Sequence, residues 1–404
     1  MLTREEQVFF TILQSVLWGK SSEVPADTSW QKVLQLAARQ SCLHAFGMWM
    51  QAQRIQSPLT QQLQPTLFQT LQRQARLNHL TAEVIQLLTQ HQIPATLIKG
   101  YSLSARYPDP DMRQYGDVDI YVGEANYHRA AEILTQTYAN AYWHSDIRGG
   151  IHYSIVLDEH IDRVVELHRV TMELPDRKAN QLFQAFTQRY LEPASCSIEV
   201  CGRRVSVPPA AYNGLYVFMH AWHHFESTGV GFRQLGDWAF CLQHAHEELS
   251  AEAWQALTAE YDQLLQAMKM KTIWQTFGHI LVDHLQLPAC AFPLYTSRYH
   301  RRAKRLLRQL LRDGHGGRPA LFQKVSKGKS VREKIQEIAL MRRFPYERPE
   351  KHRVLQVGYT CCRLVFEAIQ MAKFFPSQAW HELKHSLLLG TKKNTYHSCA
   401  QSCD

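Results

Sequence analysis

The spacing of apolar residues along the chain predicts helices at both ends and a mixed α/β region between them. Thr3 and Glu6 match a capping box, and apolar residues recur every three or four positions directly after it. Further helices are predicted over residues 30–53 and 65–93, the last of which ends before a proline that disfavours a helical backbone at the preceding residue. Residues 1–93 are therefore expected to form an N-terminal helical region.

Short apolar or alternating runs replace the helical pattern after residue 93 and are typical of strands. Strands are predicted at residues 95–98, 117–122, 152–157, 163–170, 198–200 and 204–207. The last four form two hairpins, because a short connection joins the members of each pair. Together with a helix over residues 125–138, they predict an α/β core over residues 94–208.

Helical spacing returns after Pro208 and continues toward the end of the chain. Helices are predicted over residues 210–225, 235–243, 299–312, 330–341 and 352–375, and one or two more over residues 251–282. A Gly- and Lys-rich stretch, residues 314–329, is typical of an exposed loop. Residues 209–404 are expected to form a C-terminal helical region, so the predicted fold class is α+β and helix-rich overall.

The composition is that of a globular protein, with 45% hydrophobic and 20% charged residues in a chain of 404. No apolar run approaches the roughly 18 residues that a membrane helix needs. The chain begins with a polar stretch that differs from a signal peptide, so a cytoplasmic location is expected. The nine cysteines show no CxxC pair and no zinc spacing, and they are expected to be free thiols.

The net charge of +9 is concentrated in one segment of the chain. Residues 298–343 contain fifteen Lys and Arg against three acidic residues, whereas the remainder of the chain is close to balance. The basic face of the helix predicted in this segment consists of Arg301, Arg302, Lys304, Arg305 and Arg308. This face is either solvated or a contact for nucleic acid or anionic lipid.

Two aspartates stand two residues apart in the strand predicted over residues 117–122. Asp117 and Asp119 point to the same face of that strand, because side chains alternate along it. Facing carboxylates repel each other unless a cation lies between them, so a metal site is the alternative to a solvated strand edge. Glu166, in a later strand, is either the third carboxylate or an ordinary exposed residue, and His168 could orient it or contact a phosphate.

The segment before these aspartates carries candidate phosphate ligands. Lys99 and Gly100 follow the first predicted strand, where a turn can offer backbone N–H groups and a positive charge to phosphates. Gly116 allows the backbone to approach a phosphate closely. Arg106 and Arg113 could bind a triphosphate bidentately or pair with a nearby aspartate.

These motifs together resemble an uncharacterised bacterial nucleotidyltransferase family of the polymerase-β-like superfamily. The resemblance rests on Leu97-Ile98-Lys99-Gly100, Tyr107-Pro108-Asp109-Pro110, Arg113, Gly116-Asp117-Val118-Asp119, His152 and Glu166-Leu167-His168. It extends over essentially the whole chain and implies a nucleotidyltransferase core on a small mixed β-sheet, flanked by helical regions. Lys99-Gly100 stands where the wider superfamily has Gly-Ser, a departure that is characteristic of this family.

The resemblance implies transfer of an NMP from an NTP to a hydroxyl acceptor, with release of pyrophosphate. It implies that Asp117, Asp119 and Glu166 are the catalytic and metal-binding residues, holding Mg²⁺ or Mn²⁺ in a two-metal arrangement. No motif specifies the acceptor, which could be a small molecule, a sugar, a protein or an RNA. The alternative is a catalytically inactive module of the same fold that binds nucleotide or RNA.

A His-rich helix is a further candidate for the nucleotide pocket. His220 and His224 are four residues apart and share a helix face, and His223 stands beside them. The resemblance includes such a helix followed by an Arg/Asp segment, which favours a pocket lined by His220, Arg233 and Asp237. The alternatives are a metal site on the histidines and a simple helix pair of Arg233 with Asp237.

Overall fold

A computed structural model describes residues 2–138, 141–145, 152–158, 163–174, 177–192, 196–227 and 229–316, all of which belong to one unit, Met1–Gly317. The helices predicted over residues 330–341 and 352–375 lie outside the described residues. The same holds for the predicted loop and the basic segment beyond residue 316.

Four helices precede the sheet, and the first of them confirms the predicted capping box. At the start of α1 (Arg4–Trp18), the Thr3 hydroxyl accepts a hydrogen bond from the Glu6 N–H at 3.2 Å. In return, the Glu6 carboxylate accepts one from the Thr3 N–H at 2.7 Å. These bonds satisfy N–H groups that the start of a helix otherwise leaves without partners.

The next helices differ in their bounds from the sequence-based prediction. The single helix predicted over residues 30–53 is wrong, because the chain forms α2 (Trp30–Arg39) and α3 (Leu43–Ala52) instead. Between them Ser41 takes a left-handed backbone with φ +56°, which a continuous helix cannot contain. Helix α4 (Pro58–Gln90) starts seven residues earlier than predicted and continues through an internal proline, which removes one backbone hydrogen bond.

Seven strands form one mixed sheet in the order β3-β4-β5-β2-β1-β7-β6. Their bounds are β1 (Thr96–Leu97), β2 (Val118–Tyr121), β3 (Tyr142–Ser145), β4 (His152–Asp158), β5 (Arg163–His168), β6 (Cys196–Val200) and β7 (Arg203–Val207). Both predicted hairpins, β4–β5 and β6–β7, are confirmed as antiparallel pairs. The β2–β5 and β1–β7 pairs are parallel, so the sheet is mixed as predicted, and β3 is an additional strand.

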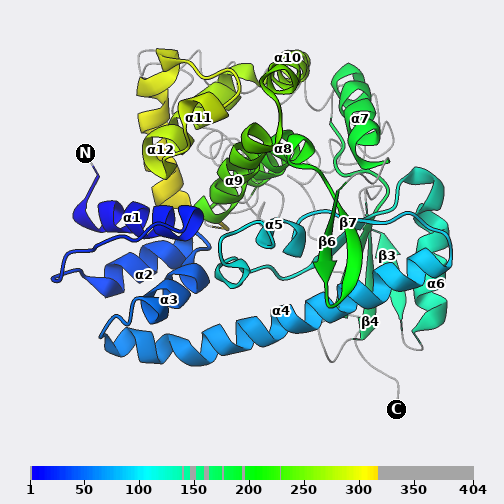
Figure 1. Cartoon of the computed structure of the whole chain (residues 1–404), viewed down its shortest axis with the longest axis horizontal. Coiled ribbons are helices and arrows are strands. Elements are labelled where there is room, and N and C mark those ends of the chain that lie inside the picture. The colour runs from blue at the N-terminus through cyan, green and yellow to red at the C-terminus, as the bar shows by residue number, and fades with distance from the viewer. Residues whose placement is uncertain are drawn as a thin grey trace, which may run out of the picture. The chain divides into compact units, whose positions relative to one another are not determined.

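Helices α4 and α6 (Tyr127–Thr137) pack against one face of the sheet, and Figure 1 shows α4 as the long helix that crosses it. Their apolar side chains share one buried cluster with alternate strand residues, including Leu80, Val84, Leu88, Ala130, Leu134, Val118, Ile120, Val165 and Leu167. The strand residues between these, Asp119 and Glu166 among them, point to the opposite face. Burial of the apolar residues therefore determines which face carries the carboxylates.

Helices dominate the rest of the described chain. Their bounds are α7 (Arg177–Leu191), α8 (Ala210–Ser227), α9 (Phe232–Glu248), α10 (Ala251–Ala267), α11 (Lys271–Leu285) and α12 (His300–Asp313). The helices predicted between Pro208 and residue 312 are confirmed, and the span predicted to hold one or two helices holds two, α10 and α11. Helix α7 is additional. Trp238 and Trp274 join α9 to α11 with ring centres 4.9 Å apart. Trp18 donates to the Leu285 carbonyl at 2.6 Å, so the N-terminal helices pack against the later ones.

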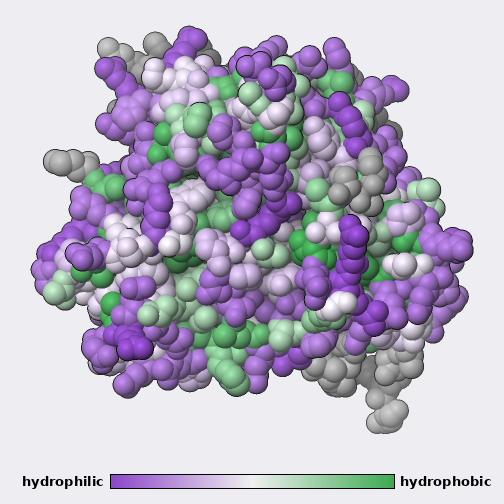
Figure 2. Space-filling model, viewed as in Figure 1, coloured by the Kyte–Doolittle hydropathy of each residue, from purple (hydrophilic) through white to green (hydrophobic). Residues whose placement is uncertain are grey.

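The surface is predominantly hydrophilic on the face shown in Figure 2, with small apolar areas scattered over it. Among the described residues, the large hydrophobic side chains that are exposed are Phe68 and Leu182. The predicted amphipathic character of α12 is present, because its leucines are buried whereas most of its basic residues are exposed. No described helix combines the length and the apolar character that crossing a membrane requires.

Candidate active site

Parallel pairing of β2 with β5 places Asp119 directly beside Glu166. His168 follows Glu166 by two residues and therefore shares its face of the sheet. This is the face away from α4 and α6, where the buried apolar cluster lies. Two of the three carboxylates that the sequence analysis put forward are thus together in the structure.

Asp119 has no exposed surface and is held by two cationic or hydrogen-bonding partners. Lys99 Nζ lies 2.6 Å, and His168 Nε2 2.8 Å, from its Oδ1 atom. Burial raises the pKa of the Asp119 carboxyl, but Lys99 and His168 outweigh it and hold this pKa well below its ordinary value. The other oxygen, Oδ2, is buried and has no hydrogen-bond partner among the described residues, which leaves it available as a ligand atom.

A tight turn after β1 brings Lys99 to Asp119. The φ angle is +83° at Lys99 and +53° at Gly100. A Cβ atom at Gly100 would lie 3.2 Å from the Asp117 carbonyl oxygen, so both the backbone angle and the close approach favour glycine. Burial lowers the pKa of the Lys99 ammonium, but the Asp119 carboxylate outweighs it and the pKa is raised. Lys99 is therefore a fixed positive charge within the site.

Asp119, Glu166 and His168 form a group whose possible ligand atoms all lie within 4.8 Å of one another. His168 Nε2 lies 3.7 Å from Glu166 Oε2, and the Glu166 side chain is 28% exposed, so the group is open to solvent at this end. Burial lowers the pKa of the His168 imidazole, but its interactions with Asp119 and Glu166 outweigh it and raise this pKa. The two carboxylates are donors that Mg²⁺ or Mn²⁺ can use, and together with an imidazole they are donors that Zn²⁺ can use.

Asp117 lies just before β2, is exposed, and is not a member of this group. The Asp119 carboxylate and partial burial raise the pKa of the Asp117 carboxyl to about 6, and Lys99 opposes the shift. Gly116, the preceding residue, is exposed as well. Asp117 is thus coupled by charge to the buried group, while its own carboxylate stands at the solvent edge.

Arg113 is buried and supports the turn that carries Lys99. Its Nε and Nη2 atoms donate to the two carboxylate oxygens of Asp237 at 2.5 and 2.9 Å, and Nη1 donates to the Gly100 carbonyl at 2.9 Å. Tyr107 Oη donates to Asp237 Oδ1 at 2.8 Å. Burial raises the pKa of the Asp237 carboxyl, but Arg113 outweighs it and the pKa is lowered. All three guanidinium nitrogens of Arg113 are therefore bonded within the protein.

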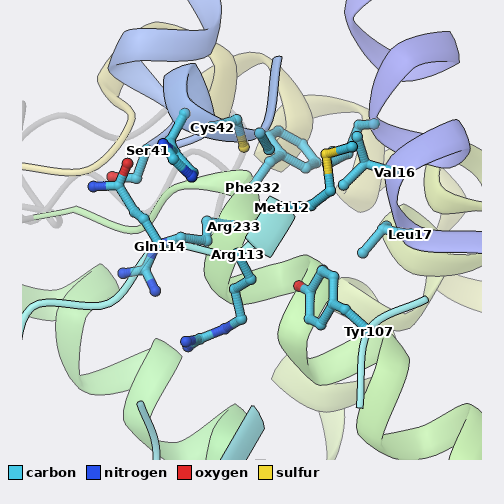
Figure 3. A pocket seen from close by; sticks show the side chains of 14 residues that line it. Val16, Leu17, Ser41, Cys42, Tyr107, Met112, Arg113, Gln114, Phe232 and Arg233 are labelled. Atoms are coloured by element: carbon cyan, nitrogen blue, oxygen red, sulfur yellow. The ribbon is translucent and has the colours of Figure 1, made fainter. Parts of the chain in front are cut away.

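Arg233 keeps part of its side chain exposed, at 24%, and lies 3.8 Å from the Asp237 carboxylate in the predicted helix pair. Figure 3 shows Arg113 and Arg233 near a small pocket whose apolar side includes Val16 and Leu17. The pocket volume of about 20 Å³ accommodates about one water molecule. This pocket is therefore too small for a nucleotide.

Helix α8 contributes a wall of the site. Tyr216 interacts electrostatically with Lys99 and Asp119, and burial raises the pKa of its hydroxyl. One turn later, His220 Nε2 lies 3.1 Å from His224 Nε2. Burial is the main cause that lowers the pKa of both imidazoles, to about 4 at His224, so this pair is neutral near pH 7. Within the described ranges, neither histidine belongs to a group of three possible metal ligands.

Two features of the site were missed from the sequence. Tyr216 stands one helical turn before His220, so the periodicity of the His-rich helix could have included it. The bond between Arg113 and Asp237 joins residues 124 positions apart, and no local pattern specifies such a pairing.

Comparison with known proteins gives one match. A family model described as an uncharacterised nucleotidyltransferase covers residues 26–273. This span is more than half of the chain and includes the whole sheet, α8 and α9. No curated protein and no solved structure was found to match the chain.

Proposed function

The chain belongs to the family of uncharacterised nucleotidyltransferases, and we propose that it transfers an NMP from an NTP to a hydroxyl acceptor, with release of pyrophosphate. The observation that carries this proposal is the group formed by Asp119, Glu166 and His168 on parallel neighbouring strands, with Lys99 against it. Rigid strands hold these side chains in fixed positions, which is what a reaction limited by alignment of a hydroxyl and a phosphate requires.

The proposed reaction uses Mg²⁺ or Mn²⁺, and the donor atoms present support this. Asp119 Oδ2 is buried without a hydrogen-bond partner among the described residues, so an ion would satisfy an atom that is otherwise costly to bury. Asp119 and Glu166 would hold the ion, and Asp117 would contribute at the solvent edge. When bound, such an ion lowers the pKa of a hydroxyl and neutralises charge on the phosphates.

The side chains around the ion site have separate proposed roles. Glu166 is the partly exposed carboxylate, so it can accept the proton of the acceptor hydroxyl. His168 bonds to Asp119 and keeps this carboxylate oriented. Lys99 neutralises Asp119 in the free protein and contacts a phosphate oxygen of the NTP as a point charge.

The triphosphate is proposed to lie between the Lys99 turn and α9. Arg233 is the arginine assigned to it, because the nitrogens of Arg113 are already bonded to Asp237 and Gly100. Arg113 and Asp237 are therefore positioning residues that hold the turn. Gly100 and Gly116 allow the backbone to approach the phosphates, and neutral His220 lines the wall beside the nucleotide.

A catalytically inactive module that binds nucleotide or RNA is the second candidate. The ion pair of Lys99 with Asp119 favours it, because an aspartate that is already neutralised does not require a metal. The exposed basic residues of α12, such as Arg301, Arg305 and Arg308, would be a further contact for RNA. Binding of this kind weakens steeply as salt is raised.

The test is incubation of the protein with each NTP labelled at its α-phosphate, together with Mg²⁺ and cell extract. We expect transfer of label by the wild type, and a loss of at least about a thousandfold in Asp119→Asn. Asp111→Asn changes an exposed aspartate outside the site and is the matched control, with a rate equal to the wild type. Equal labelling by wild type and Asp119→Asn would contradict the proposal, and salt-sensitive binding without any labelling would support the inactive module.

A further inference from the structure

A second group of possible metal ligands is built from elements that take no part in the catalytic group. His279 and Asp283 stand four residues apart on α11 and share a helix face. His300 is the first residue of α12, which packs against α11. One possible ligand atom of each residue lies within 4.8 Å of the corresponding atoms of the other two.

Two of the three distances between ligand atoms are close to the edges of a tetrahedral zinc site, and the third, between the two histidines, is within 4.8 Å. Asp283 Oδ2 lies 3.7 Å from His279 Nδ1 and 3.4 Å from His300 Nδ1. Ligand atoms about 2.0–2.1 Å from Zn²⁺ in a tetrahedron are separated by about 3.3–3.4 Å. Slight movements of the side chains would therefore bring the three atoms onto one ion.

The carboxylate of the group can be balanced by a metal cation or by one protonated histidine. Among the described residues, the ion pairs of Asp283 are with these two histidines, and no lysine or arginine takes part. Both imidazoles approach the same carboxylate oxygen, Oδ2. A metal ligand has to be a neutral imidazole, and with both imidazoles neutral a cation would supply the counter-charge of the carboxylate.

One of the three side chains is buried and the other two are partly exposed, so an ion can reach the group from solvent. The His279 side chain is 3% exposed, whereas Asp283 is 33% and His300 50% exposed. Tyr295 Oη lies 3.4 Å from His279 Nδ1 at the border of the group. The buried imidazole forms the floor, and the two other ligands can be reached from the surface.

We propose that His279, Asp283 and His300 bind one Zn²⁺ that fastens the start of α12 to α11. Two imidazoles and one carboxylate are donors that zinc takes, and water would complete the four ligands. The alternative is a surface ion pair of Asp283 with one protonated histidine, which contributes at most about 1 kcal/mol. This site is independent of the proposed catalysis, because it shares no residue with the catalytic group.

The test is the zinc content of the full chain, purified without a polyhistidine tag and dialysed against Zn²⁺. We expect about one equivalent more zinc in the wild type than in His300→Ala or Asp283→Asn by mass spectrometry of the metal, because the catalytic group is the same in all three. His91→Ala removes another exposed histidine, at the end of α4, and is the matched control with wild-type zinc content.

Two further measurements separate loss of the site from loss of the fold. Bound Co²⁺ in place of zinc should give the strong visible absorption of a tetrahedral site in the wild type and in His91→Ala, but not in His300→Ala. Zn²⁺ should raise the melting temperature of the same two proteins by more than that of His300→Ala, which retains only the catalytic group. Equal zinc content and equal Co²⁺ spectra in the wild type and His300→Ala would overturn the proposal.

Discussion

The two groups of possible metal ligands in this chain differ in how their carboxylates are neutralised. In the proposed catalytic group of Asp119, Glu166 and His168, Lys99 lies against the buried Asp119, so a charge of the protein itself already balances the carboxylate. In the group between α11 and α12, the described ion pairs of Asp283 involve histidines alone. Similar donor atoms therefore give two different sites. At Asp119 a metal ion competes with the Lys99 ammonium, whereas at Asp283 no lysine or arginine among the described residues competes with it.

The contrast teaches that donor atoms alone do not describe a metal site. An ion that has to compete with Lys99 is expected to bind weakly until a triphosphate offers the ammonium another partner, so that metal and NTP arrive together. An ion at Asp283 has no such competitor and is expected to stay bound as part of the fold. Whether a lysine or arginine lies next to the metal ligands is thus expected to decide whether the bound ion exchanges readily or stays bound.

The largest expected effect comes from removing the buried catalytic carboxylate. Asp119→Asn should abolish transfer and also lower the free energy of unfolding by about 3–5 kcal/mol, because Lys99 would then be a buried charge without a partner. Lys99→Met in the same chain should restore most of this stability but none of the activity. Urea unfolding and pyrophosphate release, measured on the single and double variants, check both parts. A double variant that regains activity would contradict the role of Asp119.

A third carboxylate, that of Asp237, extends the comparison. Arg113 donates hydrogen bonds to both of its oxygens, so neither oxygen is left as a ligand atom for a metal ion. Asp237→Asn should lower the free energy of unfolding by about 3 kcal/mol near pH 7, because Arg113 loses its buried partner. The pKa of the Asp237 carboxyl is lowered in the folded protein, so its contribution is complete above the ordinary carboxyl pKa and is lost as the pH falls through the folded pKa.

Urea unfolding at several pH values checks the expected behaviour of Asp237. The difference in stability between the wild type and Asp237→Asn should be constant at about pH 6–8 and shrink below about pH 4. Asp111→Asn, at an exposed aspartate, should show little difference at any pH. A difference that grows on acidification would mean that the carboxylate form of Asp237 is not the stabilising one.

A smaller effect is expected when the internal cation is removed from the catalytic group. Lys99→Met should raise the affinity for Mn²⁺ in the absence of nucleotide by about tenfold, or about 1.4 kcal/mol, because the ion no longer competes for Asp119. Titration calorimetry in a His300→Ala background confines the measurement to the catalytic group. Lys20→Met changes an exposed lysine and is the control. An unchanged or weaker Mn²⁺ affinity would show that Lys99 does not oppose the ion.

The smallest expected effect concerns the turn that places this lysine. Gly100 and Gly202 both have positive φ angles, +53° and +75°, so alanine is strained at either position. Only at Gly100 would the added Cβ meet another atom, the Asp117 carbonyl oxygen at 3.2 Å. Gly100→Ala should therefore lose about 1 kcal/mol more unfolding free energy than Gly202→Ala. Equal losses in urea unfolding would show that the turn tolerates the contact.

Local sequence patterns were sufficient to predict much of the fold. Alternation gave both hairpins, and helical spacing gave most helices between α1 and α12, because these signals depend on neighbours within a few residues. Alternation also indicated that Asp119 and Glu166 lie opposite the apolar residues of their strands, whereas their direct adjacency depends on the pairing of β2 with β5. The break at Ser41 did not follow, because the apolar pattern continues across it and the left-handed residue is not a glycine.

Contacts between distant segments were beyond local patterns. The position of Lys99 against Asp119 depends on the pairing of β1 with β2 and on a turn with unusual backbone angles. The sequence suggested Arg113 as a phosphate ligand. The packing of α9 shows instead that the Arg113 guanidinium is bonded to the Asp237 carboxylate. The α11–α12 metal group was not predicted either, because His300 joins the other two ligands only through the packing of the helices.

The bond between Arg113 and Asp237 has a consequence for how this chain can be divided or recombined. A fragment that ends at Pro208 would contain Lys99, Asp119 and Glu166, yet it would leave the Arg113 guanidinium buried without its carboxylate. Fusion, domain shuffling or gene splitting that separates the strands from α9 would therefore produce a core with every catalytic carboxylate and an unsupported turn. The smallest part of this chain that is expected to fold with a supported turn is therefore the sheet together with α9.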